Sequence, residues 1–153
     1  MDQTPSFSGG VFLMLTGNRR ENEYIRSMKE NFPQSEKLKD RKLIEQLFKE
    51  GSSLKKYPLR LLFLPVPNHA GSDHQVAVSV PRRLYKRAVD RNYLKRILRE
   101  GYRKNKYLVI KGLSQPYVLM FIFTGREKTS FDSVNQAVKI LLERMVGQEK
   151  NRL

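Results

Sequence analysis

Residues 82–106 read RRLYKRAVDRNYLKRILREGYRKNK, and this stretch decides both the fold and the chemistry that the chain can support. It contains eleven Lys or Arg residues and only two acids, Asp90 and Glu100, so one sixth of the chain carries +9 of a total net charge of +15. Charge concentrated in this way is costly, because like charges repel one another. The stretch therefore predicts a polyanionic partner that relieves the repulsion.

The spacing of these residues predicts a helix with two different faces, since successive side chains turn by about 100°. One face, called the basic face below, consists of Arg91, Asn92, Lys95, Arg96, Arg99 and Arg103. The opposite face is apolar and consists of Tyr93, Leu94, Ile97, Leu98 and Gly101. A merely solvated face usually mixes signs, with Glu four residues before Lys, whereas the basic face has almost no acid. We expect the apolar face to dock on a core and the basic face to contact nucleic acid.

The composition limits the class of protein. A chain of 153 residues with 39% apolar and 29% charged residues suits one soluble globular domain, and a pI near 10.2 suits work on nucleic acid. The absence of cysteine excludes a disulfide framework and a thiolate metal site. No run reaches the roughly 18 apolar residues that span a bilayer. A membrane-surface helix would also need a free apolar face, so no membrane partner is expected.

The sequence around residues 82–106 predicts a single compact α+β domain, because the predicted order is helix, strands, helix, strand and helix, which suits helices packed on one small sheet. We expect a flexible N-terminal extension over residues 1–34, the domain over 35–147 and a tail over 148–153. Six elements are predicted within the domain: a helix over 40–50 capped by Asp40, strands over 57–66 and 75–80, a helix from about 88, a strand over 117–123, and a last helix from about 131 capped by Thr129 or Ser130.

The chain shows no pattern typical of a protein that cleaves phosphodiesters by itself. Such an enzyme usually needs several carboxylates around divalent metal or a histidine acting in acid–base catalysis. The fifteen acids are scattered and mostly neighbour Lys or Arg. The two histidines, His69 and His74, flank a predicted turn with Asp73, where solvent exposure is the usual fate. We therefore predict no catalytic residue and no metal ligand in this chain.

Aromatic residues near the basic elements indicate which type of nucleic acid is bound. They are Phe48, Tyr57, Tyr85, Tyr93, Tyr102 and Tyr107. Exposed aromatics in a basic groove stack on unpaired bases, worth about 1–3 kcal/mol per base, although each of these rings could instead pack in the core. No helix-turn-helix pattern precedes the basic helix, which follows a strand and a loop. Single-stranded RNA is thus favoured over duplex DNA.

Several blocks of the sequence resemble the bacterial ribonuclease P protein family. Arg91–Glu100, RNYLKRILRE, is similar to that family's RNR-containing signature, RNRxKRxxRE. Val76–Arg83 looks like the strand and basic turn before the signature helix, and Leu38–Gly51 looks like the family's first helix. Tyr117–Phe123 and the last predicted helix fall where the family has its final strand and helix. The resemblance covers about residues 36–146. It departs from the signature at Tyr93, where the family usually has a second Arg.

The resemblance implies a fold and a function. The fold would be a mainly antiparallel sheet packed with three helices, containing a left-handed βαβ crossover. The protein would assist a catalytic RNA that, with Mg²⁺ held mainly by the RNA, removes the 5′ leader of precursor tRNA in the bacterial cytoplasm. Its partners would be ribonuclease P RNA and precursor tRNA.

The resemblance also implies roles for residues of this chain. Contacts to the catalytic RNA would come from Arg91, Asn92, Lys95, Arg96 and Arg99, supported by Arg82, Arg83 and Lys86, and Arg103 would extend the same basic face. The weaker candidates for the cleft that holds the leader are Ile44, Phe48 and Tyr57. An alternative is a structural RNA-binding protein such as a ribosomal protein, which could share this charge and fold. A sequence-specific DNA-binding protein is a third reading.

Overall fold

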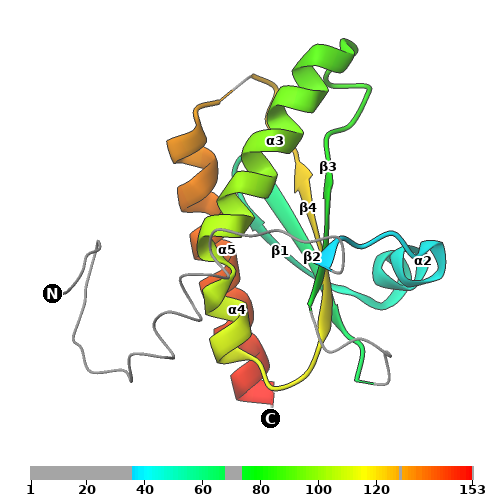
Figure 1. The fold of residues 1–153 in the computed structure, drawn as a ribbon, viewed down its shortest axis with the longest axis vertical. Helices are drawn as coiled ribbons and strands as arrows, with labels where there is room; N and C mark the ends of the chain where they lie inside the picture. Colours follow the sequence, from blue (N-terminus) through cyan, green and yellow to red (C-terminus); the bar gives the residue numbers. More distant parts are fainter. Residues whose placement is uncertain (1–35, 68–73, 128, 153) are drawn as a thin grey trace, which may run out of the picture.

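The computed structural model describes residues 36–67, 74–127 and 129–152 (Figure 1). The extension predicted over residues 1–34, like His69 and Asp73, lies outside the described residues. In chain order the elements are α2 (Arg41–Glu50), β1 (Ser52–Lys56), β2 (Leu59–Pro65), β3 (Gln75–Ser79), α3 (Ala88–Asn105), α4 (Tyr107–Gly112), β4 (Tyr117–Phe123) and α5 (Phe131–Arg152). The predicted α+β class is confirmed.

The four strands form one mixed sheet in the order β1-β2-β4-β3. β1 pairs with β2 and β2 with β4 in antiparallel fashion, whereas β3 and β4 run parallel. Parallel neighbours need a long connection, and here α3 and α4 provide it. The sheet is therefore mainly antiparallel, as predicted, and the basic helix lies inside a βαβ crossover. The left hand of that crossover stays a prediction.

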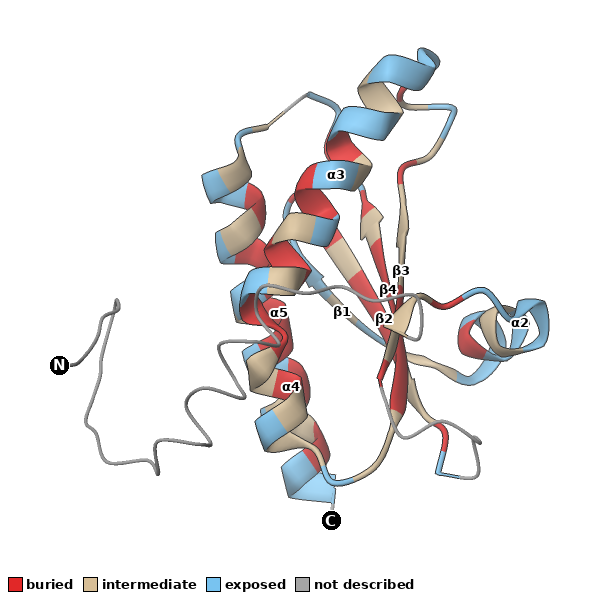
Figure 2. Ribbon diagram, viewed as in Figure 1, coloured by how far each residue is buried: buried red, intermediate tan, exposed pale blue. Residues whose placement is uncertain are grey.

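The two faces of the sheet are covered unequally (Figures 1 and 2). α3, α4 and α5 cover one face, where they enclose a large core that includes Leu61, Phe63, Leu119, Phe121 and Phe123, each at most 1% exposed. Of the described helices, only α2 covers part of the other face, where Leu47 packs with Leu62, Val118 and Met120. The alternation of side chains along each strand produces this division.

Local sequence explains where α2 begins and ends. The Asp40 side chain accepts a hydrogen bond from the Lys42 backbone N–H at 2.9 Å, as expected of an N-cap. At the other end, the Gly51 N–H donates to the Leu47 carbonyl at 2.9 Å. A Cβ on Gly51 would collide with that same carbonyl oxygen, so the close approach requires glycine.

Both edges of the sheet have contacts that occupy backbone groups. At the β3 edge, the Leu38 N–H donates to the Val76 carbonyl at 2.9 Å, and Lys37 forms an isolated parallel bridge with Val76. At the β1 edge, Nη1 of Arg144 in α5 donates to the Lys55 carbonyl at 3.2 Å. Residues distant in sequence thus cover carbonyls on both outer strands.

Several element boundaries differ from the prediction. The strand expected over 57–66 is shorter, because Tyr57 and Pro58, joined by a cis peptide bond, form the turn between β1 and β2. β1 itself was not predicted, since SSLKK contains a single apolar residue. The described chain has four helices rather than three, because α3 stops before Lys106 and α4 follows.

The last helix fits the predicted start and extends further than expected. The Ser130 hydroxyl accepts a hydrogen bond from the Ser133 N–H at 3.3 Å, so Ser130 acts as the cap. α5 then continues through Arg152, and Glu149 is buried. Residues 148–152, for which we predicted a tail, are the final turn of this helix.

Candidate nucleic-acid interface

The apolar face of α3 docks on the core, as its spacing predicts. Leu94 and Leu98 are fully buried, and Ile97 is 7% exposed. Gly101 lies against α5, where an added Cβ would sit 3.3 Å from Cγ2 of Val138. Tyr93 differs from the prediction: its side chain is 38% exposed, because its position borders the solvent side of the helix.

The basic face of α3 points into solvent along its N-terminal part. Asn92, Arg96 and Arg99 are exposed, and Lys95 is half-buried. The cations Lys95, Arg96 and Arg99 have no ion-pair partner among residues 36–67, 74–127 and 129–152. Charges that remain exposed and unpaired can meet phosphate without first breaking an internal contact, so this part of the helix can serve as an electrostatic surface for RNA.

The loop before α3 adds further cations and is held from below. Arg82, Arg83 and Lys86 are exposed, whereas Tyr85 between them is buried. The Tyr85 hydroxyl donates to the Gly125 carbonyl at 2.8 Å, and its ring meets Phe123 edge-on at 5.7 Å between centroids. Burial, reinforced by Tyr57 and nearby acids, raises the pKa of the Tyr85 hydroxyl, which keeps it a donor.

Arg91 connects this loop to the helix. Its Nη1 donates to the carbonyls of Tyr85 at 2.9 Å and Lys86 at 2.8 Å. These bonds use one end of the guanidinium for backbone, so Arg91 positions the loop. Arg91 was predicted to contact RNA directly. The structure gives it a second role, in holding the loop, that the helical spacing does not reveal.

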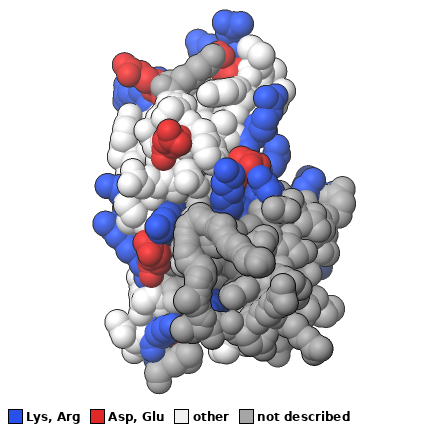
Figure 3. Space-filling model, turned by 60° about the vertical axis from the view of Figure 1, so that its left-hand side comes forward, with Lys and Arg blue, Asp and Glu red and all other residues white. Residues whose placement is uncertain are grey.

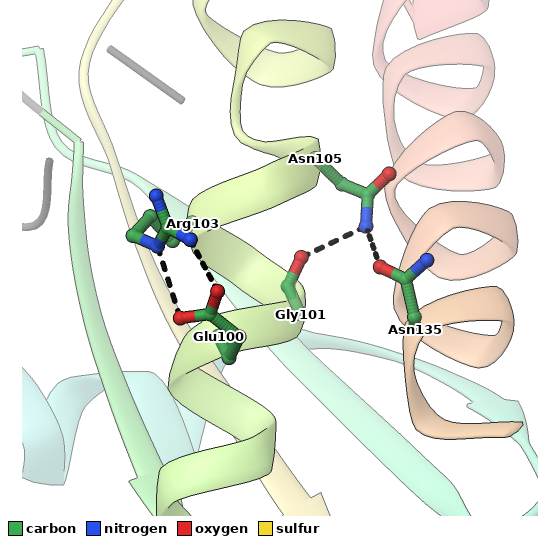
Figure 4. Close-up of polar contacts among 5 residues, drawn as sticks. All are labelled: Glu100, Gly101, Arg103, Asn105 and Asn135. Carbon is green, nitrogen blue, oxygen red and sulfur yellow. Dashed lines mark hydrogen bonds and ion pairs between the residues drawn. The ribbon is translucent and has the colours of Figure 1, made fainter. Parts of the chain in front are cut away.

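The C-terminal part of the basic face is different, because its charge is paired. Arg103 donates through Nε to Glu100 at 3.0 Å and forms a second, very short contact through Nη2 (Figure 4). The hydrogen bond from Arg103 is the main reason that the pKa of Glu100 lies below its ordinary value. Arg103 lies on the predicted face, but Glu100 neutralises it locally.

Polar contacts fix the end of α3 against its neighbours. The Asn105 amide donates to the Gly101 carbonyl at 2.8 Å and to Oδ1 of Asn135 in α5 at 2.7 Å (Figure 4). Lys106 is fully buried, and its ammonium contacts both carboxylate oxygens of Glu36 at 3.0 and 3.1 Å. Lys106 was counted with the basic segment, but it is part of the fold.

The three leader-cleft candidates do not meet in one cluster. Ile44 is half-buried on α2 and packs with the smaller core, and Phe48 on the same helix is 58% exposed. Tyr57 is 73% exposed in the turn between β1 and β2. Tyr85 and Tyr102 are core residues, so they are not available to stack on bases. Among the described residues, the most exposed aromatic side chains therefore lie apart, on α2 (Phe48), in the β1–β2 turn (Tyr57) and on α3 (Tyr93).

Figure 3 shows Lys and Arg side chains in several groups on one face of the molecule, with fewer acids among them. Within the described ranges, no three His, Asp or Glu side chains gather as metal ligands. Nδ1 of the buried His74 accepts a hydrogen bond from the Tyr117 N–H at 3.1 Å, so this ring serves the fold. No described helix has the length and apolarity needed to cross a bilayer.

Comparison with known proteins gives one consistent family. The family model for ribonuclease P matches residues 32–146. A ribonuclease P protein component of Porphyromonas gingivalis is 36% identical over 121 residues, covering 74% of this chain and 85% of that protein. The one of Thermotoga maritima is 31% identical, covering 78% and 100%. The solved Thermotoga maritima protein superimposes with a TM-score of 0.58 at 27% identity, over 71% of this chain and 96% of that one.

The fold and the exposed basic helix define the class of the molecule as an RNA-binding α+β protein. The chain belongs to the bacterial ribonuclease P protein family. It is thus the protein subunit of an endoribonuclease ribonucleoprotein that acts in tRNA processing, and ribonuclease P RNA is its partner. The family resemblance of the signature helix is thereby confirmed, and the readings as a ribosomal protein or a DNA-binding protein are wrong.

Proposed function

We propose that the chain contacts ribonuclease P RNA through the N-terminal part of the basic face and the loop over residues 81–87. The observation that carries this proposal is a group of exposed cations that form no ion pair with any described residue: Arg82, Arg83, Lys86, Arg96 and Arg99. Asn92 lies among them and supplies an amide. Phosphate contacts of this kind release counterions and dominate RNA affinity.

The second part of the proposal concerns precursor tRNA. The face of the sheet beside α2 would hold the single-stranded 5′ leader, with Ile44 and Phe48 at one side and Tyr57 at the end of the sheet. Exposed rings can stack on unpaired bases, which supports Phe48 and Tyr57 as contacts. The protein would thereby help to remove the leader and generate the mature 5′ end, in the bacterial cytoplasm.

Mg²⁺ would be held mainly by the RNA. Magnesium prefers carboxylate and phosphate oxygens, and the two acids of the basic segment are poor candidates. Glu100 is bonded to Arg103, and Asp90 lies 4.0 Å from Nε of Arg87. When bound, the metal would supply Lewis-acid chemistry for phosphodiester cleavage, while the protein's residues would bind and orient the two RNAs.

Reconstitution tests the proposal. The chain is combined with a bacterial ribonuclease P RNA at low Mg²⁺, and cleavage of precursor tRNA is followed on gels. We expect the protein to restore cleavage that the RNA alone loses at low Mg²⁺, and to cut nothing by itself. Failure to restore cleavage with a cognate RNA, despite tight RNA binding, would contradict the proposed role in processing.

A further inference from the structure

A row of four side chains crosses the sheet on the face that α2 covers only in part. The register places Lys55 of β1 opposite Arg60 of β2, Arg60 opposite Ile122 of β4, and Ile122 opposite Ser79 of β3. Directly paired residues share one face of a sheet. Lys55 is exposed, and the other three are half-buried. With strands about 4.8 Å apart, the row extends over about 14 Å.

The position of the row relates it to the rest of the interface. α2 packs on the other end of this face, around Leu62 and Val118. The row lies at the end where β3 leads through Pro81 into the basic loop and where β1 leads into the exposed Tyr57. The row therefore connects the basic loop to the β1–β2 turn across a part of the sheet that no described helix covers.

Two like charges stand directly opposite each other at one end of this row. A cross-strand pair has its Cβ atoms about 5 Å apart, and like charges in that arrangement destabilise the sheet. Neither Lys55 nor Arg60 has an acidic partner within the described parts of the chain. An anion lying between the two groups would relieve this repulsion, so the pair is suited to an anionic ligand.

The orientation of Arg60 is also fixed. Its Nε donates to the hydroxyl of Ser53 at 3.1 Å. Ser53 lies on the same face, one diagonal step along β1. The guanidinium therefore lies along the sheet surface, and its two Nη groups keep donors for a further ligand. This geometry suits the oxygens of a phosphate, which a guanidinium binds with two donors.

We propose that Lys55 and Arg60 form an anion-binding patch, separate from α3, that takes backbone phosphates of the single-stranded 5′ leader as it crosses the sheet. The half-buried Ile122 beside them offers an apolar surface for a base or ribose. This inference rests on the proposed function, because it assigns further contacts to the leader. The patch extends the leader's path from the basic loop to the edge of β1.

The test compares two double variants in the assembled ribonucleoprotein. Lys55→Ala/Arg60→Ala removes the patch, and Lys139→Ala/Lys150→Ala removes two exposed cations from α5, which covers the other face of the sheet. Affinity is measured for mature tRNA and for precursor tRNAs with leaders of increasing length. We expect the first variant to lose roughly tenfold in affinity for long leaders, with a salt slope smaller by about 1.4, since each single-strand phosphate contributes about 0.7. Mature tRNA should bind as before.

Other outcomes separate the inference from the proposed function. Equal loss for mature tRNA and for all leaders, or no loss with any substrate, would overturn the leader patch while leaving the subunit's role intact. If the unsubstituted protein fails to restore cleavage at low Mg²⁺, the proposed function itself is wrong. Lys55→Gln/Arg60→Gln keeps more of the side-chain packing, and its thermal unfolding temperature checks that both patch variants fold. The same leader-dependent loss in the Gln variant is expected, and its absence would also count against the patch.

Discussion

The N-terminal part of α3 and the segment formed by its C-terminal end and the following Lys106 both carry basic residues but use them differently. Over residues 88–99 the cations Lys95, Arg96 and Arg99 have no ion pair within the described residues. Over residues 100–106 Arg103 is bonded to Glu100, and Lys106 is buried against Glu36. Charge counted along the sequence therefore overestimates the surface available to RNA, because part of that charge belongs to the fold.

Packing explains the difference between these two ends. The C-terminal end of α3 lies against α5, where Gly101 approaches Val138 and Asn105 bonds to Asn135. Polar groups removed from water need partners, so this end must satisfy its own charges. The N-terminal end extends beyond that contact and remains free for a ligand. Four substitutions test this contrast, from the largest expected effect to the smallest.

Lys106→Ala should reduce the free energy of unfolding by about 3–5 kcal/mol, because removing one partner of a buried ion pair leaves the other uncompensated. Urea unfolding measures the change. The matched control is Lys104→Ala, which removes an exposed ammonium 5.3 Å from the centre of the Phe131 ring and should cost about 1 kcal/mol or less. Equal stability of the two variants would show that the C-terminal charges are not structural.

Arg91→Ala should release the basic loop, since two backbone carbonyls lose a donor worth about 1 kcal/mol each. The loop is rich in Lys and Arg, so trypsin cleavage after Arg82, Arg83 or Lys86 reports its opening. We expect cleavage roughly ten times faster than in the unsubstituted protein, together with weaker RNA binding. Unchanged cleavage would mean that Arg91 acts on RNA alone. Arg96→Ala, which touches no loop carbonyl, serves as the control.

Arg99→Ala should weaken binding to ribonuclease P RNA by about 1 kcal/mol and reduce the salt slope by about 0.7–0.9, the value for one phosphate contact. Arg103→Ala, four residues along, should change the slope less, because Glu100 already neutralises that guanidinium. Filter binding over a range of salt concentrations gives both slopes. A larger change for Arg103→Ala than for Arg99→Ala would reverse our assignment of the two ends of α3.

Glu100→Gln should have the smallest effect on the free energy of unfolding, and that effect should depend on pH. Because the pKa of Glu100 lies below the usual 4.5, its stabilising contribution is present above that pH and is lost as the pH falls through the lowered value. The pair is partly exposed, so a few tenths of a kcal/mol are expected. Urea unfolding between about pH 6 and about pH 3 should show a smaller loss of stability in Glu100→Gln than in the unsubstituted protein. If the free energy of unfolding changed with pH in the same way in both proteins, the proposed contribution of Glu100 would be contradicted.

Much of this fold could be predicted because the local signals agree with the tertiary structure. Asp40 and Gly51 delimit α2, the alternating valines of β3 face the core, and YVLMFIF forms β4 over the predicted residues. β1 could not be predicted, because Leu54 is its only apolar residue and its pairing with β2 defines it. An edge strand of this kind takes its structure from its neighbour.

The candidate site was predictable in position but not in pairing. Helical periodicity predicted that Leu94, Ile97 and Leu98 dock on the core and that Asn92, Arg96 and Arg99 face solvent, but it placed Tyr93 on the wrong side. It could not show that Arg91 turns back to the loop carbonyls or that Lys106 finds Glu36, because these partners depend on how distant segments meet. Lys55 and Arg60 escaped notice for a related reason. They become neighbours only through the pairing of β1 with β2, and β1 was not predicted from the sequence.

The contacts at the sheet's outer strands bear on how the subunit behaves before it meets its RNA. Open strand edges recruit further strands and lead to aggregation, which short strands and lysines counteract. Here Leu38 occupies a carbonyl of β3, while β1 is five residues long, ends in two lysines and gives its Lys55 carbonyl to Arg144. A newly made subunit in excess over RNA should therefore resist joining its copies edge to edge through these strands.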